Sequence, residues 1–125
     1  MAITVSPTNA TLGAVVTDVD LETLGDRDWS EIYKAFLEYG LLIFPNQNLS
    51  EKGQGNFALR FGDTEKLYPA QKLPTLQFSN KKADGELTKP GEPQYHLAKG
   101  NEGWHTDSTY MPLASKAAML CAFCL

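Results

Sequence analysis

The sequence has little positive charge, no long apolar run and few cysteines. Its 11 lysines and arginines stand against 15 aspartates and glutamates, which gives a formal net charge of −4 and a pI near 5.1. This balance leaves no basic surface on which phosphates could drive binding, so we expect no nucleic acid partner. Hydrophobic residues at 42% and charged residues at 21% are typical of folded globular chains. A length of 125 residues predicts one domain, or a piece of one.

Two further absences narrow the class of protein. No stretch approaches the roughly 18 apolar residues that span a bilayer, and no basic segment followed by an apolar one begins the chain, so we expect a cytoplasmic protein without a membrane partner. The only cysteines, Cys121 and Cys124, have the C-x-x-C spacing of redox and zinc motifs. They lie in the apolar run 117–125, which predicts a buried strand whose residues three apart point to opposite faces. Both are interpreted as buried structural thiols.

The amino-terminal part predicts short strands around a first helix. Strands are expected at 3–5 and 14–19, where β-branched residues gather between turn signals. Asp28 and Glu31 have the spacing of a capping box, which begins a helix that Gly40 ends. Residues at helical spacing give this helix an apolar stripe that is expected in the core: Trp29, Ile32, Tyr33, Phe36 and Leu37.

A strand and a second helix are expected next. The unbroken apolar run 41–44 predicts a strand that is covered on both faces. Ser50 is the expected N-cap of the helix, and Gly62 its stop. Gly53 and Gly55 weaken this helix by up to about 1 kcal/mol each relative to alanine.

Beyond this helix the sequence predicts a short strand at 75–79 and a long loop at 80–103. The loop is dense in Gly, Pro, Lys and Glu, and its lysines are interpreted as solvating it rather than forming an anion site. Loops longer than about 12 to 15 residues in compact domains are usually lids or disordered segments. The motif that follows this loop favours a lid.

His105 and Asp107 form an H-x-D pair directly after the loop. Residues i and i+2 of an extended backbone face the same way, so an imidazole nitrogen and a carboxylate oxygen can converge on one ion. A mixed pair of this kind suits a divalent metal, as in the 2-His-1-carboxylate site of Fe(II) oxygenases. A bare H-x-D also arises by chance, with both side chains only hydrogen-bonded. The third ligand must come from elsewhere, and His96, the only other histidine, would complete a site that also suits Zn(II).

The string Trp104–Tyr110, W-H-T-D-S-T-Y, resembles the taurine/2,4-D (TauD/TfdA-like) dioxygenase family. Members of that family carry W-H-T-D, then a hydroxyl residue and an aromatic, then a buried strand. Upstream segments are similar in the same order, so the resemblance covers nearly the whole chain: Leu12–Ala14, Asp18–Leu21, Gly40–Pro45 and Arg60–Gly62. It implies an α+β fold built on a double-stranded β-helix, or jelly roll, with flanking amino-terminal helices.

The resemblance also implies an activity. The family consists of Fe(II)- and 2-oxoglutarate-dependent dioxygenases, oxidoreductases that use O₂ to hydroxylate small organic substrates, and a small anionic substrate is expected here. His105 and Asp107 would be the first two iron ligands. Asn101 and Tyr68 lie where some members contact substrate.

The sequence departs from the family at its carboxy-terminal side. Members continue to a distal histidine ligand and to an arginine that pairs with 2-oxoglutarate. The only arginines here are Arg27 and Arg60, both in segments expected to belong to the amino-terminal helices. Residues 1–125 are therefore expected to form a single partial domain, an amino-terminal fragment with an incomplete jelly roll. A strand ending at Leu125 would expose an apolar edge, which predicts self-association or a complementing chain.

Two other interpretations stay open. In the first, the chain is an inactive truncated remnant that binds metal and pairs with another chain. In the second, it is a small Zn(II) hydrolase that uses His96, His105 and Asp107, with Glu92 or Glu102 as general base.

Overall fold

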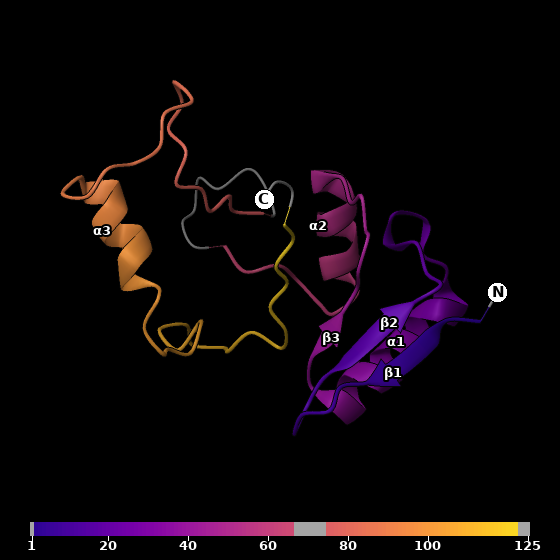
Figure 1. Cartoon of the computed structure of the whole chain (residues 1–125). Coiled ribbons are helices and arrows are strands. Elements are labelled where there is room, and N and C mark those ends of the chain that lie inside the picture. Colours follow the sequence, from indigo (N-terminus) through magenta and orange to yellow (C-terminus); the bar gives the residue numbers. More distant parts are fainter. Residues whose placement is uncertain (1, 67–74, 123–125) are drawn as a thin grey trace. The chain divides into compact units, whose positions relative to one another are not determined.

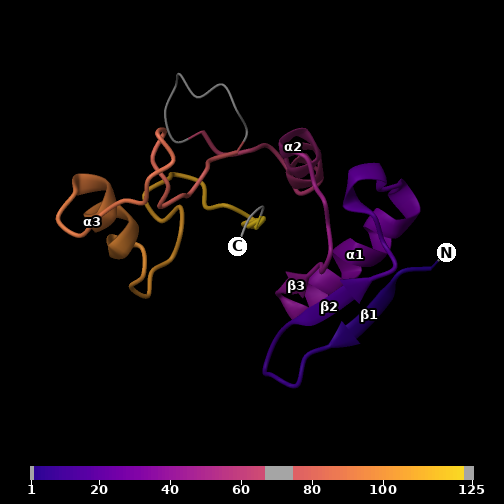
Figure 2. The same cartoon turned by 45° about the horizontal axis from the view of Figure 1, so that its top comes forward.

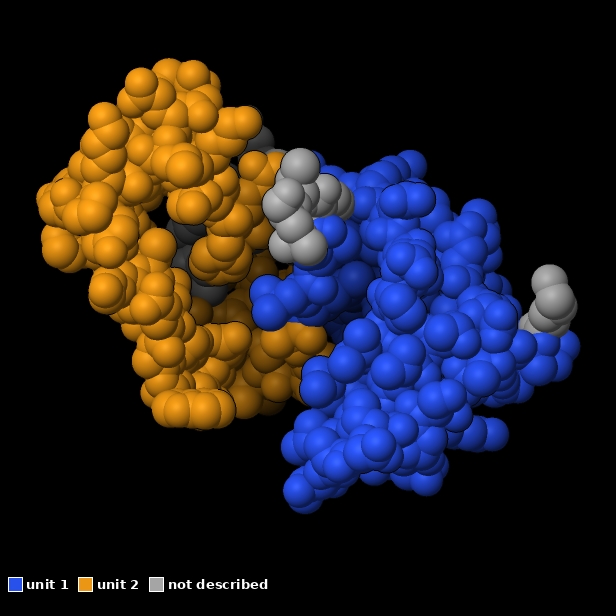
Figure 3. Space-filling view, viewed as in Figure 1, with its two compact units in different colours: residues 1–63, 119–125 blue, residues 64–118 orange. Residues whose placement is uncertain are grey.

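The computed structural model describes residues 2–66 and 75–122. The chain divides into two compact units, one of residues 1–63 with 119–125 and the other of residues 64–118 (Figure 3). Among the described residues, no helix has the length and apolar character needed to cross a membrane. The expectation of a single partial domain stays a prediction.

A three-stranded mixed sheet organises the first unit (Figure 1). Strand β1 (Thr4–Pro7) pairs antiparallel with β2 (Ala14–Thr17), and β2 pairs parallel with β3 (Leu42–Ile43). The order β1-β2-β3 places β2 in the centre, where Ala14 and Val16 are fully buried. The two strands expected at the start of the chain are confirmed, with slightly shifted ends. Sheet and helices together give the α+β composition that was expected.

Helix α1 (Asp26–Tyr39) contacts β2 and β3 and lies behind the strands in the view of Figure 1 (see also Figure 2). It begins at Asp26, so the expectation that Asp28 caps it is wrong. Both aspartates lie in the first turn instead, where carboxylates interact favourably with the helix dipole. The expected end is confirmed, because Gly40 is left-handed (φ 71°) and its N–H donates to the Phe36 carbonyl over 2.9 Å.

The core of the first unit lies between the sheet and the helices. Its buried members are Val16, Leu21, Ile32, Leu49 and Phe57. Ile32 and Trp29 of the apolar stripe belong to this core, and Trp29 packs edge-on against Phe61 with ring centroids 4.8 Å apart. Tyr33 and Phe36 are half-buried and also contact the Phe61 ring. Leu37 is 67% exposed, so its assignment to the core is wrong. The stripe is wider than the face of the helix that its neighbours cover.

Strand β3 is covered on one face only. Leu42 and Phe44 pack against the core, whereas Leu41 and Ile43 are 48% and 46% exposed. Successive side chains of a strand point to opposite faces, and α1 packs on one of them. The expectation of a strand covered on both faces is therefore wrong.

Helix α2 (Glu51–Leu59) begins at the expected N-cap, Ser50, whose Oγ accepts a hydrogen bond from the Gly53 N–H over 2.9 Å. A short 3-10 helix, η1 (Leu21–Thr23), supports this start. Its Glu22 carboxylate accepts hydrogen bonds from the Ser50 N–H (3.0 Å) and hydroxyl (2.7 Å). A Cβ at Gly53 would lie 2.0 Å from Glu22 Oε2. Glycine here disfavours the helix by itself but makes room for the carboxylate.

The other end of α2 is tied to the start of α1. The helix ends at Leu59, before the expected stop at Gly62. Arg60 follows as its C-cap, and the guanidinium binds the Asp26 carboxylate and the Leu24 carbonyl. Arg60 therefore has a structural role within the amino-terminal unit.

The second unit contains α3 (Pro93–Gly100), within the segment 80–103 that was expected to be a loop. Pro93 has no N–H that could be left unpaired at the start of the helix. Lys99 lies in the last turn, where its positive charge interacts favourably with the negative end of the helix dipole. The strand expected at 75–79 is not formed, because no described segment pairs with it. The role of the segment as a lid stays a prediction.

The strand expected at 117–125 is not formed over its described part, residues 117–122. These residues alternate between half-buried and exposed, and Met119 and Cys121 pack against the core of the first unit. The alternation is that of a strand, but no described segment supplies ladder hydrogen bonds. Cys121 is a free, half-buried thiol rather than a buried one, and Cys124 lies outside the described residues.

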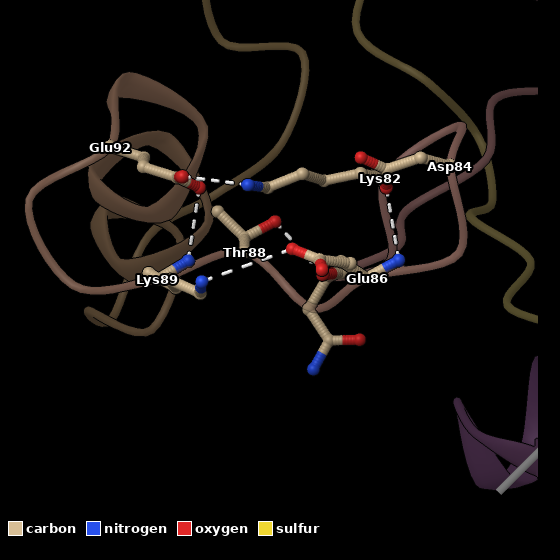
Figure 4. A network of polar contacts seen from close by, with 7 residues as sticks. Lys82, Asp84, Glu86, Thr88, Lys89 and Glu92 are labelled. Carbon is tan, nitrogen blue, oxygen red and sulfur yellow. Dashed lines mark hydrogen bonds and ion pairs between the residues drawn. The ribbon is translucent and has the colours of Figure 1, made fainter.

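A network of polar contacts precedes α3 (Figure 4). The Glu92 carboxylate accepts hydrogen bonds from Lys82 Nζ (2.7 Å) and from the Lys89 N–H (3.0 Å). The Thr88 hydroxyl donates to the Asn80 carbonyl over 2.8 Å. Lys82 is therefore paired rather than only solvating the segment. Hydrogen bonds from Lys82, then from the Lys89 backbone, hold the pKa of Glu92 below its ordinary value.

We expect Gly53→Ala to gain no stability, although alanine is favoured over glycine in a helix by up to about 1 kcal/mol. The added Cβ displaces the Glu22 carboxylate from Ser50. Urea unfolding followed by circular dichroism measures the free energy of unfolding. In a Glu22→Ala background the same substitution should stabilise the chain by up to about 1 kcal/mol. Equal effects in the two backgrounds would contradict the steric explanation.

The network before α3 should weaken at acidic pH. Because the pKa of Glu92 is lowered by folding, its contribution to stability is present above the ordinary glutamate pKa and is lost as the pH falls through the lowered value. The Lys89 amide shift, followed by NMR, should titrate with a midpoint below that of an ordinary glutamate. In Lys82→Met the midpoint should rise. A midpoint that is the same in both proteins would show that the ion pair does not set the pKa.

Candidate metal centre

The H-x-D motif lies on an irregular stretch between α3 and a turn. Residues 104–106 have no regular structure, and residues 107–110 form a turn. The Met111 N–H donates to the Ser108 carbonyl over 3.1 Å, and Ser108 has a positive φ of 60°. Within the described residues, the motif therefore lies on no strand, whereas an extended backbone was expected.

His105 and Asp107 converge nevertheless. His105 Nε2 lies 3.1 Å from Asp107 Oδ1, and the two side chains are 52% and 70% exposed. Two ligand atoms at about 2.1 Å from one metal ion, at right angles to each other, are about 3.0 Å apart. The pair therefore has the spacing of adjacent ligands. With a protonated imidazole the same spacing makes an ion pair.

Gly103 sets the tautomer of His105. His105 Nδ1 lies 2.7 Å from the Gly103 carbonyl oxygen, which can only accept, so Nδ1 carries the proton. In the neutral ring, Nε2 then carries the lone pair, which points toward Asp107. Histidines that bind metals usually donate their other N–H in this way. The Gly103 carbonyl, followed by the charge of Asp107, raises the pKa of His105.

The donor set fits a divalent metal in part. One imidazole nitrogen and one carboxylate oxygen are the ligand types of a 2-His-1-carboxylate site. Within residues 2–66 and 75–122, no three His, Cys, Asp or Glu side chains are grouped to hold an ion. The described part of the chain therefore brings together two ligands, His105 and Asp107.

The other candidate residues are not brought into this pair. His96 lies on α3, where its ring contacts Tyr95, and it forms no three-residue group with the pair, so the described residues give the Zn(II) hydrolase no support. Asn101 is the exposed C-cap of α3. Tyr68 lies outside the described residues. Glu92 is engaged by two lysines, whereas Glu102 lines a shallow pocket beside His105.

The family model for the taurine catabolism dioxygenase TauD, TfdA family matches residues 4–123. The chain belongs to the TauD/TfdA family. The resemblance seen in the sequence is thereby confirmed.

Curated relatives agree with this membership. The chain is 42% identical over 123 residues to an (S)-phenoxypropionate/alpha-ketoglutarate-dioxygenase of Sphingobium herbicidovorans, covering 97% of this chain and 40% of the relative. A protein of the same name from Delftia acidovorans is 40% identical, over 94% of this chain and 41% of the relative. An alpha-ketoglutarate-dependent 2,4-dichlorophenoxyacetate dioxygenase of Cupriavidus pinatubonensis is 29% identical, over 98% and 46%. The chain thus spans less than half the length of these relatives.

A solved structure is similar over most of the chain. The crystal structure of AAD-2 in complex with Mn(II) and N-oxalylglycine superposes with a TM-score of 0.75 at 27% identity. The match covers 90% of this chain and 38% of that one. The described fold is therefore that of a part of a TauD/TfdA-family protein.

Sequence reasoning missed one residue that contacts the turn after the H-x-D motif. Glu65 lies 43 residues before Ser108, and its Oε2 accepts hydrogen bonds from the hydroxyls of Ser108 and Ser115. Ser108 is 5% exposed and directly follows Asp107. No motif or periodicity links residues so far apart, so only the tertiary structure could reveal the contact.

We expect His105 to titrate above an ordinary histidine. Because folding raises its pKa, the stabilisation is complete below the unfolded pKa and is lost as the pH rises through the folded one. Ring-nitrogen NMR of the metal-free chain measures this midpoint and the tautomer, which should carry its proton on Nδ1. Asp107→Asn should lower the midpoint only part of the way, since the Gly103 hydrogen bond remains. A neutral ring protonated on Nε2 would contradict the assignment.

Proposed function

We propose that this chain provides the first two metal ligands, His105 and Asp107, of an Fe(II)- and 2-oxoglutarate-dependent dioxygenase, of which it forms the amino-terminal part. The observation that carries the proposal is the 3.1 Å approach of His105 Nε2 to Asp107 Oδ1, with the other ring nitrogen held by Gly103. Family membership supports it, because the relatives are named as alpha-ketoglutarate dioxygenases.

The residues of the chain have distinct roles in this proposal. His105 and Asp107 would hold Fe(II), and the Gly103 carbonyl keeps the imidazole proton on Nδ1, away from the metal side. The chemistry supplied at such a site is the activation of O₂, with 2-oxoglutarate as cosubstrate, for hydroxylation of a C–H bond. The exposure of the pair leaves room for these other ligands.

The substrate class follows from the relatives. The curated relatives are named for phenoxypropionate and 2,4-dichlorophenoxyacetate, both aryloxy carboxylates. We therefore propose a small anionic substrate of the aryloxyalkanoate type. Asn101 and Tyr68 are kept as proposed substrate contacts on the resemblance alone.

The remaining parts of the site would come from sequence beyond this chain. The third metal ligand and the arginine for 2-oxoglutarate would be supplied by a complementing segment or chain, together with the remaining strands of a jelly roll. The exposed apolar residues Leu113 and Leu120 would be covered by such a partner. The alternative is an inactive remnant that still binds metal. Metal binding distinguishes both of these from a chain that has no metal site.

Metal binding is the first test. Under anaerobic conditions the purified chain should bind Fe(II), and with 2-oxoglutarate it should develop the weak visible band of the chelate. His105→Ala should lose the band and weaken metal binding by more than about tenfold. His96→Ala is the matched control, because it removes the other histidine from outside the pair. Equal binding by the His105 variant, or no binding by the folded wild type, would refute the proposed site.

A further inference from the structure

Three side chains of the second unit form a triangle of hydrogen bonds, one from the segment after α2 and two from the region that follows the H-x-D motif. Glu65 Oε2 accepts hydrogen bonds from the Ser108 hydroxyl and, over 2.8 Å, from the Ser115 hydroxyl. The two serine oxygens lie 2.9 Å apart. The triangle joins the segment after α2 to both ends of the turn region that follows the H-x-D motif.

Ser108 is the member that connects this triangle to the metal centre. It is 5% exposed, whereas its neighbours Asp107 and Thr109 are exposed. Its φ of 60° is unfavourable for a residue with a side chain, so the surroundings must hold it there. Its carbonyl accepts the Met111 N–H that closes the turn. The backbone direction at Asp107 is therefore set by how Ser108 is anchored.

Glu65 is suited to be that anchor. A carboxylate accepts several hydrogen bonds at once, and bonds to a charged acceptor are stronger than neutral ones. Those from Ser108 and then Ser115 hold the pKa of Glu65 below its ordinary value, so the group is charged at neutral pH. The Tyr110 hydroxyl also interacts with this carboxylate, although no described hydrogen bond reaches its buried Oε1. The two serines therefore supply the hydrogen bonds that the structure describes to Oε2.

We propose that Glu65 is a positioning residue of the metal centre: through Ser108 and Ser115 it fixes the turn that aims Asp107 at His105. The inference rests on the proposed function, because the pair that Glu65 would position is the proposed metal pair. It assigns a role to a residue outside the motif and outside the segment that carries the ligands. Groups that orient metal ligands typically change metal affinity by about 10- to 100-fold when they are removed.

Four variants of the full chain separate positioning from charge. Glu65→Ala removes the anchor, Glu65→Gln keeps its shape and one acceptor oxygen, and Ser108→Ala keeps the Glu65 charge but breaks the connection. Thr109→Ala is the matched control, because it removes an adjacent, exposed hydroxyl. Mn(II) affinity is measured by electron paramagnetic resonance, and hydrogen exchange of the Met111 amide is measured by NMR without metal.

We expect Glu65→Ala and Ser108→Ala to weaken Mn(II) binding about 10- to 100-fold and to speed exchange at Met111, with Glu65→Gln between them and the wild type. Thr109→Ala should match the wild type in both measurements. If exchange at Met111 is unchanged in Glu65→Ala, or if exchange rises while Mn(II) affinity stays equal to that of Thr109→Ala, the positioning role is wrong. Weaker binding in Glu65→Ala and Glu65→Gln but not in Ser108→Ala would also overturn it, in favour of charge alone.

Failure of the proposed function gives a different result. If the folded wild type binds no Mn(II), the metal site itself fails, and the inference is then judged on the metal-free spectra. Glu65→Ala must shift the Asp107 and His105 resonances, and Thr109→Ala must leave those of His105 in place. Unchanged resonances in Glu65→Ala would overturn the inference independently of the metal.

Discussion

Ile32 and Val16 are fully buried where α1 packs against the sheet, and the arrangement of the first unit depends on that burial. Burying an aliphatic side chain of this size stabilises a fold by about 1.5 to 3 kcal/mol, more than a typical single hydrogen bond contributes. Val16 of the central strand β2 lies in the core with Ile32, whereas Ile43 of the edge strand β3 is 46% exposed, because successive side chains of a strand point to opposite faces. Polar contacts such as those of Glu22 and Arg60 then fix where the helices begin and end.

The two proposed metal ligands are held by different kinds of contact. The ring of His105 is oriented by a carbonyl two residues away, so its tautomer depends only on local backbone. Asp107 lies at the start of a turn whose next residue is tied to Glu65, far back in the chain. The orientation of His105 is therefore set by the nearby backbone, whereas that of Asp107 depends on the folded unit around it.

Local signals in the sequence predicted elements where side chain and backbone interact within a few residues. Gly40 ends α1 and Ser50 begins α2 as expected, because each acts through its own conformation or hydrogen bond. Two expected strands and one expected core position, which depended on distant partners, were wrong. The strand expected at 75–79 and the described part of 117–125 have the composition of strands but no described partner, and Leu37 lies outside the covered face of its helix.

The sequence by itself determined the family and the candidate ligands, because W-H-T-D is a contiguous motif and the spacing of His105 and Asp107 brings their side chains together over one intervening residue. The tertiary structure alone decided the surroundings of that pair. It placed His96 on a separate helix and brought Glu65 to Ser108 across 43 positions of the sequence. The physical reason is range: spacing along the backbone fixes contacts between near neighbours, whereas contacts between distant residues form only when the chain packs.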